Sequence, residues 1–226
     1  MTLALPRVAD SGRSGGALRD RRLVGLLALT LLGLAIAPVA TAADSMTIVV
    51  VPASTSSAFR DATLVYLDGP IDPGAPDRLG RALDGVEGKI VAWLNSAGGN
   101  LFAGMQLGRI LRRHGAWTQI VNSRTLLPGE CYSACGLAFL GGVRRSNDSG
   151  ARYGVHRASL QAGRASGDRD LAQDLSAAIG GYMREMGVDT RLLDLWRKAG
   201  PDGMYLLSRR EAVDLRVVND GAPRPE

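Results

Sequence analysis

The residues best suited to chemistry lie between Gly129 and Gly142, in the sequence GECYSACGLAFLGG. Ser133 stands in a turn of small residues between Cys131 and Cys135, and an apolar run follows at once. This layout predicts a tight turn that feeds a buried helix, with Ser133 close to the N-terminus of that helix. Unpaired N–H groups and the helix dipole favour negative charge there, as acyl transfer through a serine requires. The alternative is that Ser133 is an ordinary N-cap residue.

Two further features could complete such a site. Gly98-Gly99 lies between a predicted strand and a predicted helix, and His156 ends a later predicted strand. A serine needs a general base to become a nucleophile at neutral pH, and histidine is the usual one. A glycine turn can present a bare N–H to an oxyanion, with the Ala134 N–H as a second donor. In the alternative interpretation, His156 is a core histidine and the glycines form an ordinary turn.

The elements that would position these residues alternate between strands and helices. Apolar and β-branched runs predict strands at 47–51, 63–67, 89–94, 117–121, 152–156 and 215–218. Helical spacing and capping residues predict helices at 76–84, 101–114, after Ser133, at 168–186, near 192–196 and after Ser208. This order predicts an α/β fold with a mostly parallel sheet and crossover helices. Loops after successive parallel strands gather at one edge, so the glycine turn, Ser133 and His156 are expected to meet.

The N-terminal 45 residues have the pattern of a targeting segment. Arginines precede the apolar run Leu23 to Ala37, and Ala40-Thr41-Ala42 is a small-residue cleavage site. We expect export to the periplasm or another extracytoplasmic compartment, with cleavage near Ala42. The alternative is an uncleaved anchor, in which case this segment alone contacts the membrane. The predicted organisation is a signal peptide at 1–42, an arm or linker at 43–62, one folded domain at 63–220 and a disordered tail at 221–226.

Charge and cysteine content narrow the function classes. The predicted signal peptide carries five arginines and two aspartates, a net +3, so the net charge of +5 falls to about +2 in the mature chain, which therefore lacks a nucleic-acid-binding footprint. The cysteines number two, and in an exported protein Cys131 and Cys135 are a disulfide candidate. Their C-x3-C spacing does not match the usual zinc or redox motifs, so no metal site is predicted. Two buried free thiols are the alternative.

Several segments together resemble the proteolytic subunit of the Clp protease, within the Clp protease and crotonase superfamily. The stretch NSAGGNLFAGMQLGRIL resembles that family's N-S-P-G-G turn and helix, CYSACGLAFLGG its serine turn, and YGVHR its histidine strand. Residues 168–186 fall where the family has its handle helix, and YLLSRREAVDLRVV resembles its F-L-S-x-x-E-A segment. The resemblance covers roughly Thr63 to Val218 and is closer still to exported bacterial Clp-like proteins with cysteines flanking the serine.

The resemblance implies a role for each site residue. Ser133 would be the nucleophile and His156 the base, and Gly99 and Ala134 would supply the oxyanion N–H groups. The family's third member is an aspartate shortly before the F-L-S segment.

Here the strict offset for that aspartate falls on Gly200. Asp202 is therefore expected to complete the triad, with Asp194 as the fallback.

These observations predict an exported serine hydrolase, an ATP-independent peptidase with a Ser-His(-Asp) acyl-enzyme mechanism. Its substrates would be peptides or unfolded proteins, it would need no cofactor, and the handle-like helix suggests a homo-oligomer. The alternative is a catalytically inactive Clp-like binding or assembly protein of the cell envelope. Weaker alternatives are a crotonase-like acyl-CoA enzyme and a Ser–Lys peptidase that would use Lys89 or Lys198.

Overall fold

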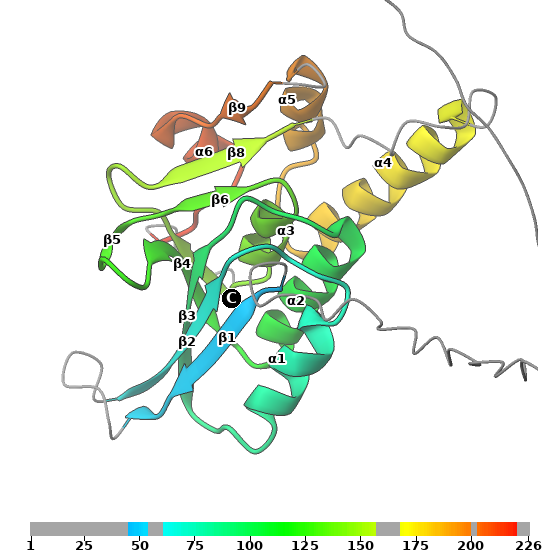
Figure 1. Cartoon of the computed structure of the whole chain (residues 1–226). Helices are drawn as coiled ribbons and strands as arrows, with labels where there is room; N and C mark the ends of the chain where they lie inside the picture. The colour runs from blue at the N-terminus through cyan, green and yellow to red at the C-terminus, as the bar shows by residue number, and fades with distance from the viewer. Residues whose placement is uncertain (1–44, 54–60, 157–167, 200–202, 221–226) are drawn as a thin grey trace, which may run out of the picture. The chain divides into compact units, whose positions relative to one another are not determined.

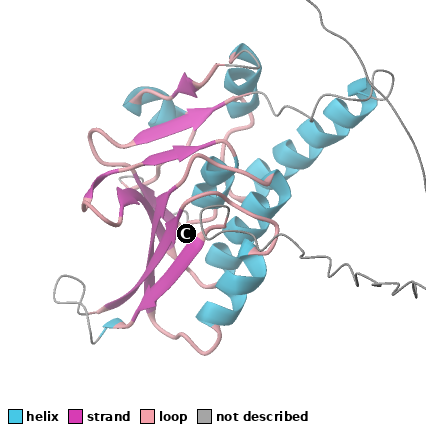
Figure 2. Ribbon diagram, viewed as in Figure 1, coloured by secondary structure: helices cyan, strands magenta, loops and turns pink. Residues whose placement is uncertain are grey.

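The computed structural model describes residues 45–53, 61–156, 168–199 and 203–220, all within one unit that spans Val39–Glu226. In this part of the chain, strands form a six-stranded and a three-stranded sheet, and helices pack beside them (Figures 1 and 2). Four of the strand pairs, β2–β3, β3–β4, β4–β7 and β6–β8, are parallel. The α/β class and the mostly parallel sheet are therefore confirmed.

The larger sheet has the order β1-β2-β3-β4-β5, and β7 also pairs with β4. Its strands are β1 (Thr47–Val51), β2 (Ala62–Asp68), β3 (Lys89–Asn95), β4 (Trp117–Asn122), β5 (Leu127–Pro128) and β7 (Arg144–Ser146). The smaller sheet has the order β6-β8-β9 and consists of β6 (Glu130–Tyr132), β8 (Arg152–Val155) and β9 (Tyr205–Leu206). An isolated bridge between Ser96 and Cys131 joins the end of β3 to β6 and so connects the two sheets.

The helices follow the predicted order along the chain. They are α1 (Ala75–Leu83), α2 (Leu101–Arg113), α3 (Ala134–Leu140), α4 (Asp168–Glu185), α5 (Leu192–Lys198) and α6 (Arg209–Asp214). The predicted capping box is present at the start of α6, where the Ser208 and Glu211 side chains each bond the other's backbone N–H. All seven residues of α3 are buried, as a helix that is apolar on every side requires.

Glycine residues allow α2 to lie directly against α3. A Cβ added to Gly104 would lie 2.4 Å from the carbonyl oxygen of Ala134. The space at Gly108 admits the Tyr182 side chain of α4, whose hydroxyl donates a 2.7 Å hydrogen bond to the Leu137 carbonyl. The start of α3 is thus fixed from the side of α2.

The apolar stripe of α4 packs mainly inside this chain at its C-terminal end. Ile179, Tyr182, Met183 and Met186 are all buried in the main hydrophobic core. The structure therefore favours intrachain packing for this half of the stripe.

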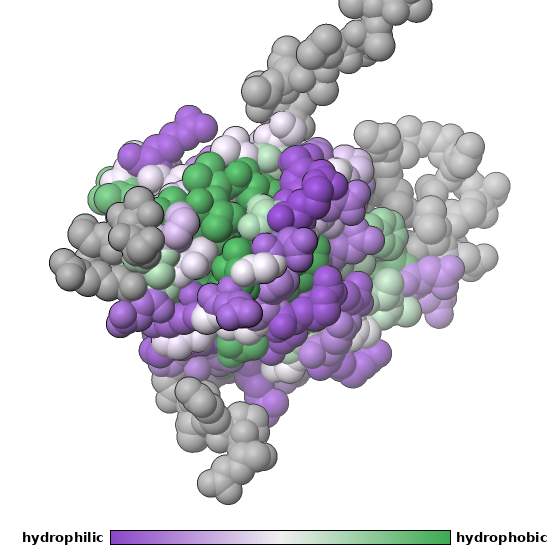
Figure 3. All heavy atoms as spheres, turned by 90° about the horizontal axis from the view of Figure 1, so that it is seen from below, coloured by the Kyte–Doolittle hydropathy of each residue, from purple (hydrophilic) through white to green (hydrophobic). Residues whose placement is uncertain are grey.

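A smaller apolar cluster lies apart from the main core. Its buried members Ala62, Leu64 and Val91 pack with the partly buried Trp93 and Trp117. The surface seen from below is largely hydrophilic and is interrupted by several hydrophobic areas (Figure 3).

The predicted last strand at 215–218 is wrong. Leu215 ends α6, and the backbone that follows is held by a buried arginine instead of a strand partner. The Arg145 guanidinium donates hydrogen bonds to the carbonyls of Arg216, Val217 and Gly142 at 2.8 to 2.9 Å. Burial lowers the pKa of Arg145 to about 10, and the guanidinium still carries its charge at neutral pH.

The turn before α1 contains a charged network. The Asp72 carboxylate accepts hydrogen bonds from the backbone N–H groups of Met46 and Gly74 and from the Arg78 guanidinium. The hydrogen bond from Arg78 is the main reason that the pKa of Asp72 lies well below its usual range. The network therefore ties the segment before β1 to α1.

Candidate active site

Ser133 has an unusual backbone conformation at the junction of β6 and α3. Its φ is 56° and its ψ is −121°, a combination that is sparsely populated for a residue with a Cβ. Its N–H donates to the Gly154 carbonyl of β8 at 3.0 Å, and its own carbonyl accepts from the Gly136 N–H at 2.9 Å. Although Ser133 occupies the N-cap position, its side chain makes no capping hydrogen bond. The N-cap alternative therefore does not explain this serine.

The Gly98-Gly99 turn lies against Ser133. Both glycines have positive φ, +104° and +141°. A Cβ on Gly98 would lie 2.8 Å from the Ser133 Cβ and 3.3 Å from the Ala134 nitrogen. The structure thus brings together the glycine turn, Ser133 and the first amide of α3, as the sequence predicts.

Backbone hydrogen bonds hold the glycine turn on its other side. The Ile71 N–H donates to the Gly98 carbonyl, and the Ile71 carbonyl accepts from the Asn100 N–H, both at 2.8 Å. The Ser96 hydroxyl accepts from the Gly98 N–H at 3.0 Å. A Cβ on Gly99 would lie 2.3 Å from the Ile71 oxygen, so this close approach requires glycine.

The sequence predicts that the backbone N–H groups of Gly99 and Ala134 form an oxyanion hole. In the part of the chain that the structure describes, the N–H groups of Gly99 and Ala134 donate no hydrogen bond to a protein oxygen. Gly99 is exposed, whereas Ala134 is fully buried. A carbonyl oxygen that reached both donors would therefore sit beside Ser133.

His156 lies at the same end of the smaller sheet as Ser133. It directly follows β8, and the parallel register pairs Tyr132 of β6 with Gly154 of β8. Ser133 follows Tyr132 by one residue and His156 follows Gly154 by two, so both residues leave their strands at the same end of the sheet. His156 is half-buried, and continuation of the β8–β9 register places Met204 opposite it.

Tyr132 and Met204 form an apolar wall beside these residues. A Cβ on Gly154 would lie 2.6 Å from the Tyr132 ring and 2.8 Å from the Met204 sulfur, so both side chains close over a bare stretch of backbone. Burial raises the pKa of the Tyr132 hydroxyl above its ordinary value. The wall favours contact with an apolar part of a ligand.

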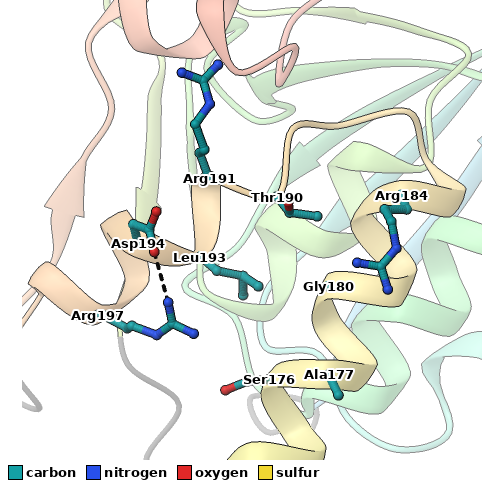
Figure 4. A pocket seen from close by; sticks show the side chains of 9 residues that line it. All are labelled: Ser176, Ala177, Gly180, Arg184, Thr190, Arg191, Leu193, Asp194 and Arg197. Carbon is teal, nitrogen blue, oxygen red and sulfur yellow. Dashed lines mark hydrogen bonds and ion pairs between the residues drawn. The ribbon is translucent and has the colours of Figure 1, made fainter.

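The sequence predicts Asp202, or Asp194 as the fallback, as the third member of the triad. Asp202 lies outside the described residues. Asp194 lies on α5, is exposed and forms an ion pair with Arg197 at 2.8 Å. It lines a pocket of about 460 Å³ between α4 and α5, together with residues such as Arg184 and Leu193 (Figure 4). Asp194 is thus bound to an arginine in a pocket that neither Ser133 nor His156 lines.

Asn95 and Asp68 are supporting residues that the sequence analysis did not single out. The Asn95 side chain accepts from the Glu130 N–H at 3.1 Å and donates to the Asp68 carboxylate at 3.4 Å. The Ser123 hydroxyl also donates to Asp68, at 3.1 Å. The ends of β2 and β3 therefore fix the start of β6, the strand that carries Ser133. In the sequence, the one indication of a structural role for these two residues is that Asn95 is the first residue of the glycine-turn motif.

Cys131 and Cys135 form a disulfide with a Cα–Cα separation of 5.1 Å. The predicted pairing is confirmed, and both residues are fully buried. Disulfides persist in oxidising compartments, so the bond is compatible with an extracytoplasmic location. Within the described ranges, no helix is both long and apolar enough to cross a bilayer, and no group of three or more potential metal ligands is present.

Comparison with known proteins identifies a fold. No family model and no curated protein sequence matches the chain, whereas 380 chains of solved structures do. One is a serine-to-alanine mutant of the 1510-N membrane-bound stomatin-specific protease, with a TM-score of 0.52 and 17% sequence identity. The match covers 70% of this chain and 75% of that protein. Together with the mixed sheet and its helices, it shows that the chain has a Clp protease/crotonase-like fold.

Proposed function

We propose that this chain is an exported serine hydrolase that acts as an ATP-independent peptidase. The observation that carries the proposal is the left-handed backbone of Ser133, held between Gly98 and Gly154 at the edge where β8 delivers His156. Strained residues of this kind cost about 1–3 kcal/mol and concentrate at functional sites. The protease fold of the structural neighbour supports the same reaction class.

In the proposed reaction, the Ser133 Oγ attacks the carbonyl carbon of a peptide bond while His156 takes its proton. The carbonyl oxygen becomes an oxyanion and accepts hydrogen bonds from the Gly99 and Ala134 N–H groups. His156 then gives the proton to the leaving amine as the C–N bond breaks. Water attacks the resulting ester as His156 takes its proton. The bond between the acyl carbon and Ser133 Oγ then breaks, His156 returns the proton to that oxygen, and the acid is released.

Asp202 completes the proposed triad by accepting from the second ring nitrogen of His156. A carboxylate in that place orients the ring and stabilises its charged form. Substrates would be short peptides or unfolded chains, since no ATP drives unfolding outside the cytoplasm. We also propose cleavage of the signal peptide near Ala42 and a homo-oligomeric assembly, which intact mass and light scattering of the purified protein would test.

The test is covalent labelling of the full-length chain, expressed with its own N-terminal segment, by a fluorophosphonate probe. We expect labelling of the wild type and none of Ser133→Ala, with a strong loss in His156→Gln. Ser208→Ala is the matched control, because that serine caps α6 and should leave labelling intact. Cleavage of an unfolded fluorescent protein then separates a peptidase from an esterase. A folded wild type that is not labelled would refute the hydrolase and favour a Clp-like binding or assembly protein.

A further inference from the structure

The Cys131–Cys135 disulfide closes a short ring of chain around Ser133. Cys131 belongs to β6, and Cys135 is the second residue of α3. Each cysteine is two positions from Ser133, and their Cα atoms lie 5.1 Å apart. The covalent bond therefore spans the point at which the strand becomes the helix.

Few other local restraints act on this point. Among the described residues, the Ser133 backbone makes one hydrogen bond to Gly154 on the strand side and one to Gly136 on the helix side. The Ser133 side chain adds no capping bond. A positive φ is disfavoured for a residue with a Cβ, so the turn tends to relax towards ordinary backbone angles.

We propose that the disulfide is a positioning element that holds Ser133 in its reactive conformation. This inference rests on the proposed function. The bond fixes the distance between the residues on either side of the turn and so limits rotation about the Ser133 backbone. The Ser133 hydroxyl and the Ala134 N–H are carried on the same short segment, so both keep their places relative to Gly98 and Gly99.

The burial of both cysteines determines how readily the disulfide can be reduced. Neither side chain is exposed to solvent, so a reductant reaches the bond only after local opening of the turn. The disulfide therefore acts as a permanent brace of the native protein, in contrast to an exposed bond that would respond quickly to redox conditions.

The test compares the labelling rates of the wild type and the double variant Cys131→Ala/Cys135→Ala at a temperature well below unfolding. A misplacement near 1 Å costs about a hundredfold in rate, so we expect the maximal labelling rate to fall about 10- to 100-fold. Wild type reduced in mild denaturant and refolded under reducing conditions, with free thiols, should match the variant. Wild type refolded with reoxidation should regain its rate. Hydrogen exchange should rise in residues 130–140 and not across the fold.

Leu83→Ala in α1 is the control for a general loss of stability, because it removes buried volume far along the chain from the turn. It should lower the melting temperature and leave the labelling rate unchanged. If the double variant melts lower but is labelled at the wild-type rate, the disulfide is merely structural and the inference is wrong. If folded wild type is not labelled at all, the proposed function fails first, and the brace has no reaction to position.

Discussion

Gly98→Ala would test the geometry of the site most directly. The new methyl group would lie 2.8 Å from both the Ser133 Cβ and the Tyr132 carbonyl oxygen, well inside an ordinary contact of about 3.5–4.0 Å. It would also lie 3.3 Å from the Ala134 nitrogen, the second proposed oxyanion donor. The methyl group would therefore displace the serine and obstruct one oxyanion donor.

The expected magnitudes separate activity from folding. An alanine at the φ of +104° found at Gly98 costs of order 1–3 kcal/mol of stability, and the close contacts with Ser133 and Tyr132 add about 1–3 kcal/mol more. The sum is below the upper part of the 5–15 kcal/mol typical of a folded domain, so the melting temperature of the variant is measured first and labelling is compared in folded protein. A displacement of Ser133 near 1 Å lowers reactivity about 100-fold. We expect the second-order rate of fluorophosphonate labelling to fall by about that factor while circular dichroism is unchanged.

Gly115→Ala supplies the matched control. Gly115 also has a positive φ, +62°, but an added Cβ there meets nothing within 4 Å. This variant should lose stability through its backbone and keep the wild-type labelling rate. A folded Gly98→Ala protein that is labelled as fast as wild type would refute the proposed arrangement of Ser133 and the glycine turn.

Four further variants test the packing and the charged contacts of the fold by thermal or urea unfolding. Gly104→Ala should destabilise the fold by about 2 kcal/mol or more, because the methyl group would meet the Ala134 carbonyl at 2.4 Å. Gly80→Ala in α1, where a Cβ meets nothing, should stabilise by up to about 1 kcal/mol. Arg145→Met should destabilise by about 3 kcal/mol or more, because several buried carbonyls lose their donor. The lowered pKa of Asp72 stabilises the fold above the ordinary value of 3.8, and this contribution is lost as pH falls through the folded-state pKa. Asp72→Asn should therefore cost about 2 kcal/mol at pH 7 and flatten the acid unfolding curve; equal effects at pH 7 and pH 2 would contradict this.

The sequence predicts the longer elements well because they carry their own periodic signal. The run KIVAWL forms β3, and LFAGMQLGRILRR forms α2. The short strands β5, β6, β7 and β9 were not predicted, because two or three residues show no period and owe their pairing to distant segments. The segment 215–218, with one leucine and two valines, looks like a strand by composition, but the Arg145 side chain takes the carbonyls of residues 216 and 217 that a strand partner would use.

The residues of the candidate site come from the sequence, but the conformation of Ser133 does not. The glycine turn, the serine and the histidine are expected close together because each follows a strand and the strand ends gather at one edge. The φ of Ser133 does not follow from residue type, because serine has no preference for left-handed backbone. It depends on the pairing of β6 with β8 and on the approach of Gly98, which are both long-range contacts, and, as proposed above, on the disulfide that spans the turn.

A positive φ alone does not mark a functional residue, as two other positions show. Leu126 and Arg216 have almost the same φ as Ser133, 57° against 56°. Both are exposed, and they lie in turns where a left-handed residue simply reverses the chain. Ser133 instead joins a strand and a fully buried helix, and its side chain caps nothing. Glycine would be the least strained residue at such a junction. A serine that contributes neither a cap nor a favourable backbone is what the proposed reactive hydroxyl predicts.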